Sequence, residues 1–238
     1  MASVSMAPVS REEVSKAIRE KGYWILDDAS VGPRVGSLLK DGFELQNIEA
    51  LDLLDLIFER QQQVLDAIDD NFAEPVLGYF RAWGLMKQHH CFLNNLETPH
   101  SETSILNITL CSSNTLWDID EGSHLHRLNA TEHSSGMLGV DDNRLHELGI
   151  KSAEADLKHG GFIVHDGRTS FRIHRGKVLF AGVMTPAEAM EWHPMPLPKT
   201  EPFADKIAKL KGRNQGFVRK FVWEAPVSED GNASGSKT

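Results

Sequence analysis

A histidine and a carboxylate lie close together in the segment 99–106, which reads PHSETSIL. His100 and Glu102 are two residues apart, at the start of an apolar run that predicts a strand over 104–110. Because successive side chains of a strand alternate between its faces, both side chains point the same way. An imidazole nitrogen and a carboxylate oxygen can then bind one divalent cation. A third ligand has to come from elsewhere in the chain.

Histidine is abundant, with 11 residues in the chain, most of them in its second half. A single histidine is more often a surface or hydrogen-bonded core residue than a ligand, so only patterns of histidine with other donors are informative. Two histidines and one carboxylate form the facial triad that holds Fe(II) in non-haem oxygenases, with positions left open for other ligands.

Local signals predict helices in the first half of the chain. Ser10 and Glu13 fit a capping box that begins a helix, and Gly22 is its natural end. The aromatic and branched run 23–26 follows as a buried strand. Helical spacing of apolar residues predicts one long helix over 45–72, and residues 78–88 are interpreted as a short helix or an irregular crossing.

From His89 onward, short apolar runs separated by turn residues predict a mostly β second half. Asp166-Gly167 is a hairpin signal between two of these runs. A polar segment over 129–159, with a helix near 142–148, is interpreted as an insertion over the barrel. The predicted strands of this half span residues 104–110, 161–164, 169–174, 177–182 and 217–224.

Helices followed by antiparallel strands predict an α+β fold, in which a double-stranded β-helix of the jelly-roll, cupin-like type has helices packed on one side. The length of 238 residues favours a single domain, which we expect over 1–226. Residues 227–238 are too polar to pack and predict a disordered tail.

Composition narrows the partners and the location. The formal net charge of -9 argues against binding to nucleic acid, and no apolar run is long enough to cross a membrane. With no secretory signal at its start, the chain is expected to be cytoplasmic. Cys91 and Cys111 are too few for a disulfide framework and are expected to be buried thiols. A small-molecule substrate is the expected partner, and a homo- or heterodimer is left open.

Several short motifs resemble the 2-oxoglutarate/Fe(II)-dependent oxygenase superfamily, in its isopenicillin N synthase-like branch. The segment 89–110 resembles the strand and loop that lead into a His-x-Asp pair, and 160–168 resembles a Gly-Gly hairpin of that branch. Residues 175–182 are similar to the strand that follows the hairpin. His193 falls where the superfamily places its distal histidine, and Arg219 begins a segment that resembles its closing strand.

This resemblance implies a cofactor site. His100, Glu102 and His193 would be the catalytic metal ligands for Fe(II), and Arg219 would pair with a carboxylate of 2-oxoglutarate, with Arg213 as the reserve candidate. A planar guanidinium can hold a carboxylate through two parallel hydrogen bonds. The motif is degenerate, because Glu102 stands where the superfamily has aspartate.

Two alternative assignments of the metal-binding motif, which we call the His133 register and the phytanoyl-like register, remain open. His133, two residues before Ser135, resembles a His-x-Asp site that has lost its acid. The turn Gly122-Ser123-His124 resembles that of the phytanoyl-CoA dioxygenase-like branch. In that register His89 or His90 would be the first ligand, without an acid two residues later.

The resulting hypothesis is a dioxygenase that acts on a small organic molecule, such as one of secondary metabolism, with Fe(II) and 2-oxoglutarate as cofactors. The glutamate in place of aspartate motivates two alternatives on the same barrel. One is a metal-independent cyclase or isomerase that uses acid–base groups. The other is a non-catalytic subunit that pairs with an active partner. A fold alone does not decide among these functions.

Overall fold

The computed structural model describes residues 9–40, 47–93, 102–211 and 221–224 of the chain. Its helices are α1 (Arg11–Lys21), α2 (Val31–Leu38), α3 (Ile48–Arg60), α4 (Gln62–Asn71), α5 (Asp142–Glu147), α6 (Pro186–Glu191) and α7 (Glu201–Lys211), with a 3-10 turn at Ser123–Leu125. Its strands are β1 (Tyr23–Asp27), β2 (Val76–Trp83), β3 (His89–Cys91), β4 (Ile105–Cys111), β5 (Thr115–Asp120), β6 (Thr131–Glu132), β7 (Leu138–Val140), β8 (Ser152–Leu157), β9 (Gly161–Asp166), β10 (Phe171–Arg175), β11 (Val178–Met184), β12 (Met195–Pro198) and β13 (Phe221–Glu224).

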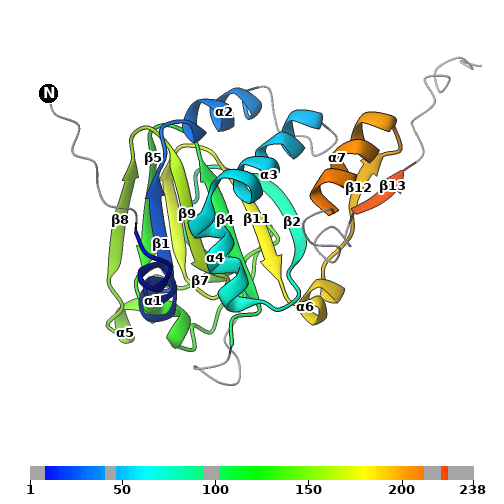
Figure 1. Ribbon diagram of the computed structural model, residues 1–238. Helices are drawn as coiled ribbons and strands as arrows, with labels where there is room; N and C mark the ends of the chain where they lie inside the picture. Colours follow the sequence, from blue (N-terminus) through cyan, green and yellow to red (C-terminus); the bar gives the residue numbers. More distant parts are fainter. Residues whose placement is uncertain (1–8, 41–46, 94–101, 212–220, 225–238) are drawn as a thin grey trace, which may run out of the picture.

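Most strands belong to two antiparallel sheets (Figure 1). A five-stranded sheet has the order β1-β9-β4-β11-β2, and a six-stranded sheet has the order β6-β7-β3-β10-β5-β8. Strands β12 and β13 pair in parallel as a separate two-stranded sheet beside α7. The order of β4, β9 and β11 is not the order of the chain, so the sheets are interleaved rather than simple meanders.

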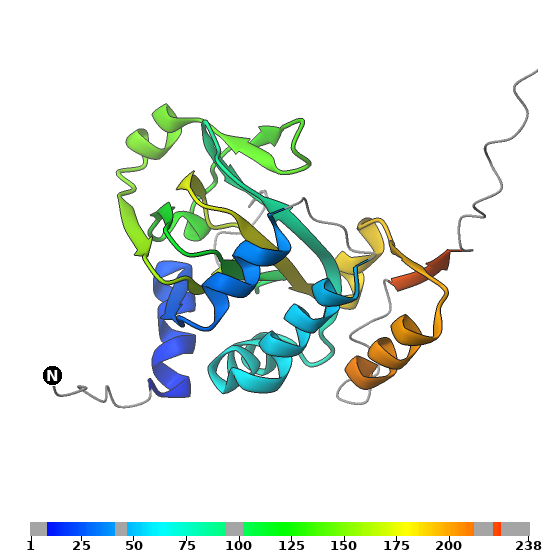
Figure 2. The same ribbon diagram turned by 90° about the horizontal axis from the view of Figure 1, so that it is seen from above.

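Helices α1 to α4 form a layer over the outer face of the five-stranded sheet (Figure 2). Apolar side chains from α1 to α4 and from α7 form one buried cluster with residues of the sheet, in which Leu54 and Ile68 of the helices join Leu106 and Phe162 of the strands. We call this the helix-facing core. It confirms the predicted α+β class with helices on one side of the strands.

A second core lies between the two sheets and is called the inter-sheet core. It contains Tyr79 and Phe180 from the five-stranded sheet and Trp117, Phe171 and Ile173 from the six-stranded sheet. Sheets that face each other over a shared apolar layer are the arrangement expected of a double-sheet jelly roll. Closure of the sheets into a complete barrel remains a prediction.

The first helix is determined locally, as predicted. The Ser10 backbone N–H donates to Glu13 Oε2 at 2.8 Å, and the Glu13 N–H donates to Ser10 Oγ at 3.3 Å, which completes the capping box. Gly22 ends the helix with φ of 90°, a left-handed conformation that suits glycine. Val14 and Ile18 are its buried positions.

The single helix predicted over 45–72 is wrong within the described residues, because it is divided into α3 and α4 at Gln61. Gln61 has φ of -114° and ψ of 83°, and its Nε2 donates to Asp28 Oδ2 at 2.7 Å. A straight helix over that whole segment would be roughly 40 Å long. The break folds the second half of the segment back over the sheet. The Gln61–Asp28 hydrogen bond stabilises the break, and the periodicity of apolar residues cannot predict such a tertiary contact.

The interpretation of residues 78–88 as a helix or an irregular crossing is also corrected, since β2 spans Val76–Trp83. The first five residues of β2 are all buried, because helices cover one face of the strand and the inter-sheet core covers the other. A strand covered on both faces has no alternation of polar and apolar residues. The period-two signal was therefore absent.

The structure also places the polar segment 129–159 and the described end of the chain. Of the segment 129–159, strands β6, β7 and β8 belong to the six-stranded sheet, and α5 starts at Asp142 inside the predicted range 142–148. The described end of the chain pairs with β12 as β13 rather than with either large sheet. None of the helices in the described ranges is long and apolar enough to cross a bilayer.

The two cysteines are free and buried, as expected. Cys91 lies in a small cluster with Val140 and Leu145, and Cys111 lies in the inter-sheet core. Burial raises the pKa of the Cys91 thiol to about 12, and it also raises the pKa of Cys111. Neither thiol is therefore a ready nucleophile at neutral pH.

Gly160, in the turn between β8 and β9, is expected to tolerate no side chain. It has φ of 88°, and a Cβ there would lie 2.3 Å from Gly32 Cα and 2.6 Å from Cys111 O. We expect Gly160→Ala to lower the free energy of unfolding by at least about 2 kcal/mol, measured by urea denaturation. Gly149→Ala is the control, since Gly149 has φ of 66° but open space around a Cβ. Equal losses for both variants would show that the close approach has no effect.

Candidate functional site

Two of the predicted ligands lie near the same end of the five-stranded sheet. Glu102 lies three residues before β4, and His193 follows α6 by two residues. The segments that carry them are joined where the Thr185 N–H donates to the Ser104 carbonyl at 3.0 Å. We call this end the hairpin end, because the turn 166–170 between β9 and β10 also lies there.

The two predicted ligand side chains at the hairpin end face solvent. Glu102 and His193 are both exposed, and the described part of the chain contains no group of three His, Cys, Asp or Glu side chains placed to hold a metal. His100, Arg213 and Arg219 lie outside the described residues. The donor set fits Fe(II) in kind, as one carboxylate and one imidazole share an end of the sheet with the segment that leads to His100.

Trp192 connects the hairpin end to the inter-sheet core. Its indole N–H donates to Glu188 Oε1 at 3.0 Å, and its ring lies 4.4 Å from that of Tyr79. The ring of Tyr79 in turn stacks at 5.1 Å on Phe92. The residue just before His193 is thus fixed against the aromatic side chains that close this end of the core.

The His133 register does not supply a ligand set among the described residues. His133 is exposed, and its Nδ1 lies 3.0 Å from Ser135 Oγ, so the position of the lost acid is a hydrogen-bond partner rather than a second charge. The ring of His133 lies 4.8 Å from that of His90. The structure thereby brings together histidines from two different registers, without a carboxylate at that contact.

The phytanoyl-like register places its first ligand on β3. His90 pairs across the strands with Phe171, and two residues later Phe92 stacks on Phe171 at 5.9 Å. The cross-strand neighbours of His90 are thus Phe171 and Gly139, neither of which has a side chain that binds metal. Burial lowers the pKa of His90, with the hydrogen bond to the Gln88 carbonyl acting against it.

His89 points to the opposite side of β3 from His90. Its Nδ1 lies 2.6 Å from Asp120 Oδ2, and Asp120 also accepts a hydrogen bond of 2.6 Å from Ser152 Oγ. These contacts of the buried His89 and Asp120 join β3, β5 and β8 within the six-stranded sheet. His124, in the 3-10 turn, has its Nε2 3.1 Å from the Arg19 carbonyl and so contacts α1.

Sequence reasoning missed a line of polar side chains inside the inter-sheet core. Asn107 and Thr109 lie on β4, and His165 lies on β9 directly opposite Asn107 in the strand register. The Tyr79 hydroxyl donates to Asn107 Oδ1. Trp117, on β5 of the other sheet, has its ring 6.1 Å from that of His165. All five side chains are at most 1% exposed.

A signal for this line was present in the sequence. In the strand predicted over 104–110, Leu106, Ile108 and Leu110 alternate with Asn107 and Thr109, so one face of an otherwise apolar strand carries polar groups. Both faces are buried, because the first lies in the helix-facing core and the second faces the other sheet. A buried polar face is informative in a way that an exposed one is not.

The core keeps these groups uncharged. Burial lowers the pKa of His165 to about 4, and the hydrogen bond to the Asp166 carbonyl and the charge of Asp166 oppose it only in part. Burial raises the pKa of Tyr79 well above its usual value. At neutral pH the line therefore consists of a neutral imidazole, a phenol, an amide, a hydroxyl and an indole.

A buried ion pair between Arg168 and Asp166 lies in the turn at the hairpin end. Arg168 donates from Nε to Asp166 Oδ1 at 2.8 Å and from Nη2 to Oδ2 at 2.7 Å, and Thr103 Oγ1 adds a bond of 2.6 Å. Burial by itself raises the pKa of Asp166, but the bonds from Arg168 and its charge, with the bond from Thr103, leave that pKa below its usual value. The pair holds the turn in which the predicted Asp-Gly hairpin signal lies.

Comparison by sequence identifies no relative, since no protein-family profile and no curated protein matches the chain. Comparison with solved structures identifies proteins that share the fold. The epimerase SnoN, solved with Fe3+, alpha ketoglutarate and nogalamycin RO, superposes with a TM-score of 0.52 at 12% identity over 74% of this chain and 83% of its own. The protein therefore shares its overall fold with SnoN.

Two further solved structures are less similar. The carbocyclase SnoK from nogalamycin biosynthesis has a TM-score of 0.46 at 15% identity, covering 75% of this chain and 86% of its own. EctD from S. alaskensis, solved with 2-oxoglutarate and 5-hydroxyectoine, has a TM-score of 0.47 at 15% identity, covering 78% of this chain and 79% of its own. Membership of the 2-oxoglutarate/Fe(II)-dependent oxygenase superfamily, and of a branch within it, stays a prediction.

Proposed function

We propose that this protein is an Fe(II)- and 2-oxoglutarate-dependent enzyme that oxidises a small organic molecule, such as one of secondary metabolism. The observation that carries the proposal is the placement of Glu102 and His193 on joined segments at one end of a fold shared with SnoN. These two residues, with His100, would hold the metal, and Arg219 or Arg213 would hold the cosubstrate. When bound, iron and 2-oxoglutarate supply the oxidising chemistry.

The described residues provide placement and exclude water. Trp192 is anchored by Glu188 and packs on Tyr79, so it orients the start of the segment that carries His193. Thr103, next to Glu102, is fixed by its hydrogen bond to Asp166. The aromatic inter-sheet core lies beneath them and would keep water from any part of a substrate that enters it.

Anaerobic addition of Fe(II) and then 2-oxoglutarate to metal-stripped protein tests this proposal. We expect a visible charge-transfer band, and we expect Glu102→Ala and His193→Ala each to weaken Fe(II) binding by more than about tenfold, since a lost ligand costs more than a lost outer partner. Glu191→Ala is the matched control, because Glu191 is an exposed carboxylate two residues before His193. No band at high iron, or a band that survives both variants, would refute the proposal.

A metal-independent cyclase or isomerase on the same fold is the second candidate. The neutral, buried His165 beside Asn107 favours it, because an imidazole held against hydrogen-bonding groups can move a proton without a metal. Substrate turnover that persists without O2 and without 2-oxoglutarate would support this candidate against the first.

A further inference from the structure

Unpaired polar atoms gather in the inter-sheet core. Among the described residues, Asn107 Nδ2, Thr109 Oγ1, His165 Nε2 and Trp117 Nε1 are buried and have no hydrogen-bond partner. A buried polar group without a partner costs free energy, so native proteins rarely keep one without a reason. Four of them on one layer therefore point to something that they bind.

These atoms belong to side chains that are held in place. Asn107 and His165 are directly opposite on β4 and β9, and Thr109 follows on the same face of β4. The Tyr79 hydroxyl occupies Asn107 Oδ1, which leaves the amide N–H groups as the free side of Asn107. Trp117 faces them from the other sheet, 6.1 Å from His165 between ring centres.

The free atoms have a defined polarity. Asn107 Nδ2 and Trp117 Nε1 can only donate. His165 Nδ1 lies 3.2 Å from the Asp166 carbonyl and must carry the proton to bond to it, so Nε2 is an acceptor. With the pKa of His165 lowered to about 4 by burial, the imidazole stays neutral at pH 7. The complementary molecule offers an acceptor to the donors and a hydroxyl to His165.

The surroundings exclude a charged ligand. The charged side chains that are buried in the described ranges are Asp120, Asp166 and Arg168. Asp120 contacts His89, and the other two pair with each other, so none of them is left to compensate a buried ion. The neighbouring side chains are aromatic, with the rings of Phe171 and Phe180 at 5.2 Å and 6.0 Å from that of His165.

We propose that the inter-sheet core binds a neutral, ring-bearing small molecule that carries a carbonyl-type acceptor for Asn107 and Trp117 and a hydroxyl for His165. Thr109 completes the site, because its hydroxyl can donate or accept. The inference rests on the proposed function in that it names the class of substrate. Ordered water bound to the same atoms is the competing explanation.

Three probes of the same shape distinguish these requirements, with binding measured by calorimetry on the full chain without iron or 2-oxoglutarate. The neutral probe para-hydroxyacetophenone has a hydroxyl and a carbonyl, para-hydroxybenzoate adds a charge, and para-ethyltoluene has no polar atoms. We expect the first to bind at least about tenfold more tightly than the other two. Equal affinities, or tighter binding of the anion, would overturn the proposal.

A matched pair of substitutions tests the site itself. Thr109→Val removes a hydroxyl that has no partner, whereas Thr115→Val removes an equally buried one that donates to the Ser112 carbonyl at 2.7 Å. We expect Thr109→Val to raise Tm by about 2–4 °C and to weaken binding of para-hydroxyacetophenone several-fold. We expect Thr115→Val to lower Tm by a similar amount and to leave binding unchanged.

The outcomes separate this inference from the proposed function. If Thr109→Val lowers Tm as Thr115→Val does, the hydroxyl is satisfied by structural water and the ligand site is refuted. Probe binding that survives in Glu102→Ala, together with loss of the iron band in that variant, would support both proposals independently. If the wild-type protein forms the iron band but does not bind para-hydroxyacetophenone, the proposed ligand class is refuted and the proposed function is not.

Discussion

Replacing Arg168 by methionine is expected to lower the free energy of unfolding by about 3–5 kcal/mol, because the Asp166 carboxylate would remain buried without its counter-charge. The two side chains are 8% and 2% exposed, and Arg168 donates two parallel hydrogen bonds to the carboxylate. Urea denaturation with a far-ultraviolet circular dichroism readout measures this loss. The turn that it holds also carries the strand connection at the hairpin end.

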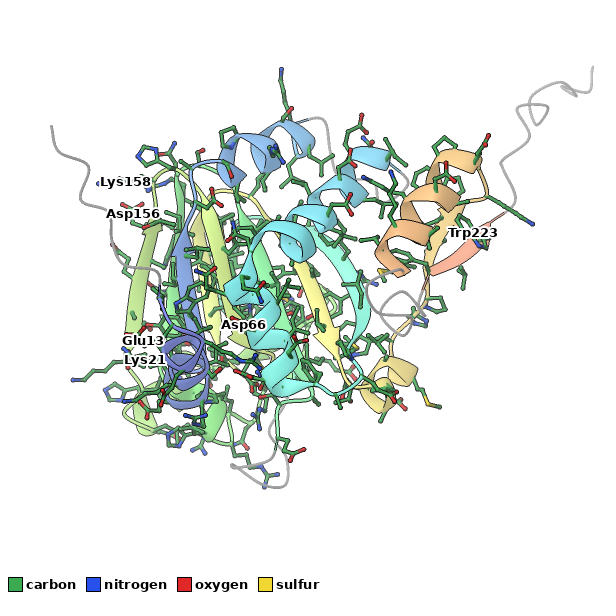
Figure 3. The ribbon with its side chains drawn as sticks, viewed as in Figure 1. Glu13, Lys21, Asp66, Asp156, Lys158 and Trp223 are labelled. Atoms are coloured by element: carbon green, nitrogen blue, oxygen red, sulfur yellow. The ribbon has the colours of Figure 1, made fainter. Side chains whose placement is uncertain are left out.

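An exposed pair gives the matched control. Arg175 lies 3.4 Å from Asp156, and their side chains are 56% and 36% exposed. Asp156 is on β8, at the outer edge of the six-stranded sheet, well away from Trp223 on the other side of the molecule (Figure 3). Arg175→Met should cost at most about 1 kcal/mol. Similar losses for the two variants would show that burial does not determine the value of the Asp166 pair.

Acidification is expected to destabilise the protein between about pH 6.5 and pH 4 through His165. In the unfolded chain His165 takes up a proton near its ordinary pKa of 6.5, whereas burial lowers its pKa to about 4 in the folded protein. The unfolded state therefore binds more protons in this window, so stability is full above it and is lost as pH falls through it. The whole shift corresponds to about 3 kcal/mol.

Unfolding free energies of wild type and His165→Gln across this range measure the effect. The variant lacks the titrating group, so its stability should depend less steeply on pH. His146→Gln, which removes an exposed histidine of α5, should keep the wild-type slope. Because the pKa of Asp166 lies below its usual value, that carboxylate destabilises the fold only at lower pH. A parallel slope for His165→Gln would show that His165 is protonated in the folded state.

Elements with local signals were predictable from the sequence. The capping box at Ser10 and the left-handed Gly22 determine α1 through neighbours a few residues away. The Asp-Gly turn and the apolar runs around it gave β9, β10 and β11 in the same way. β2 could not be recognised, because both of its faces are buried, and the break at Gln61 depends on Asp28, far away in the chain.

In the candidate site, too, the residues close together in the sequence were predictable and those brought together by the fold were not. His100 and Glu102 were found from adjacent residues, and nothing in the described part of the chain tests whether they bind metal together with His193. The polar line in the inter-sheet core depends on strand register, since Asn107 and His165 become neighbours only when β4 pairs with β9. Trp117 joins them from the other sheet, which no local pattern could predict.

The central strands of the five-stranded sheet have no exposed position. Every residue of β4, β9 and β11 is buried, and alternate side chains belong to the helix-facing core or to the inter-sheet core. Residues such as Ile108 maintain the fold, while the adjacent Asn107 and Thr109 face the site. Substitutions at the site-facing positions of β4 can therefore change ligand preference without altering the side chains that pack under the helices, so the two cores can diverge independently along a single strand.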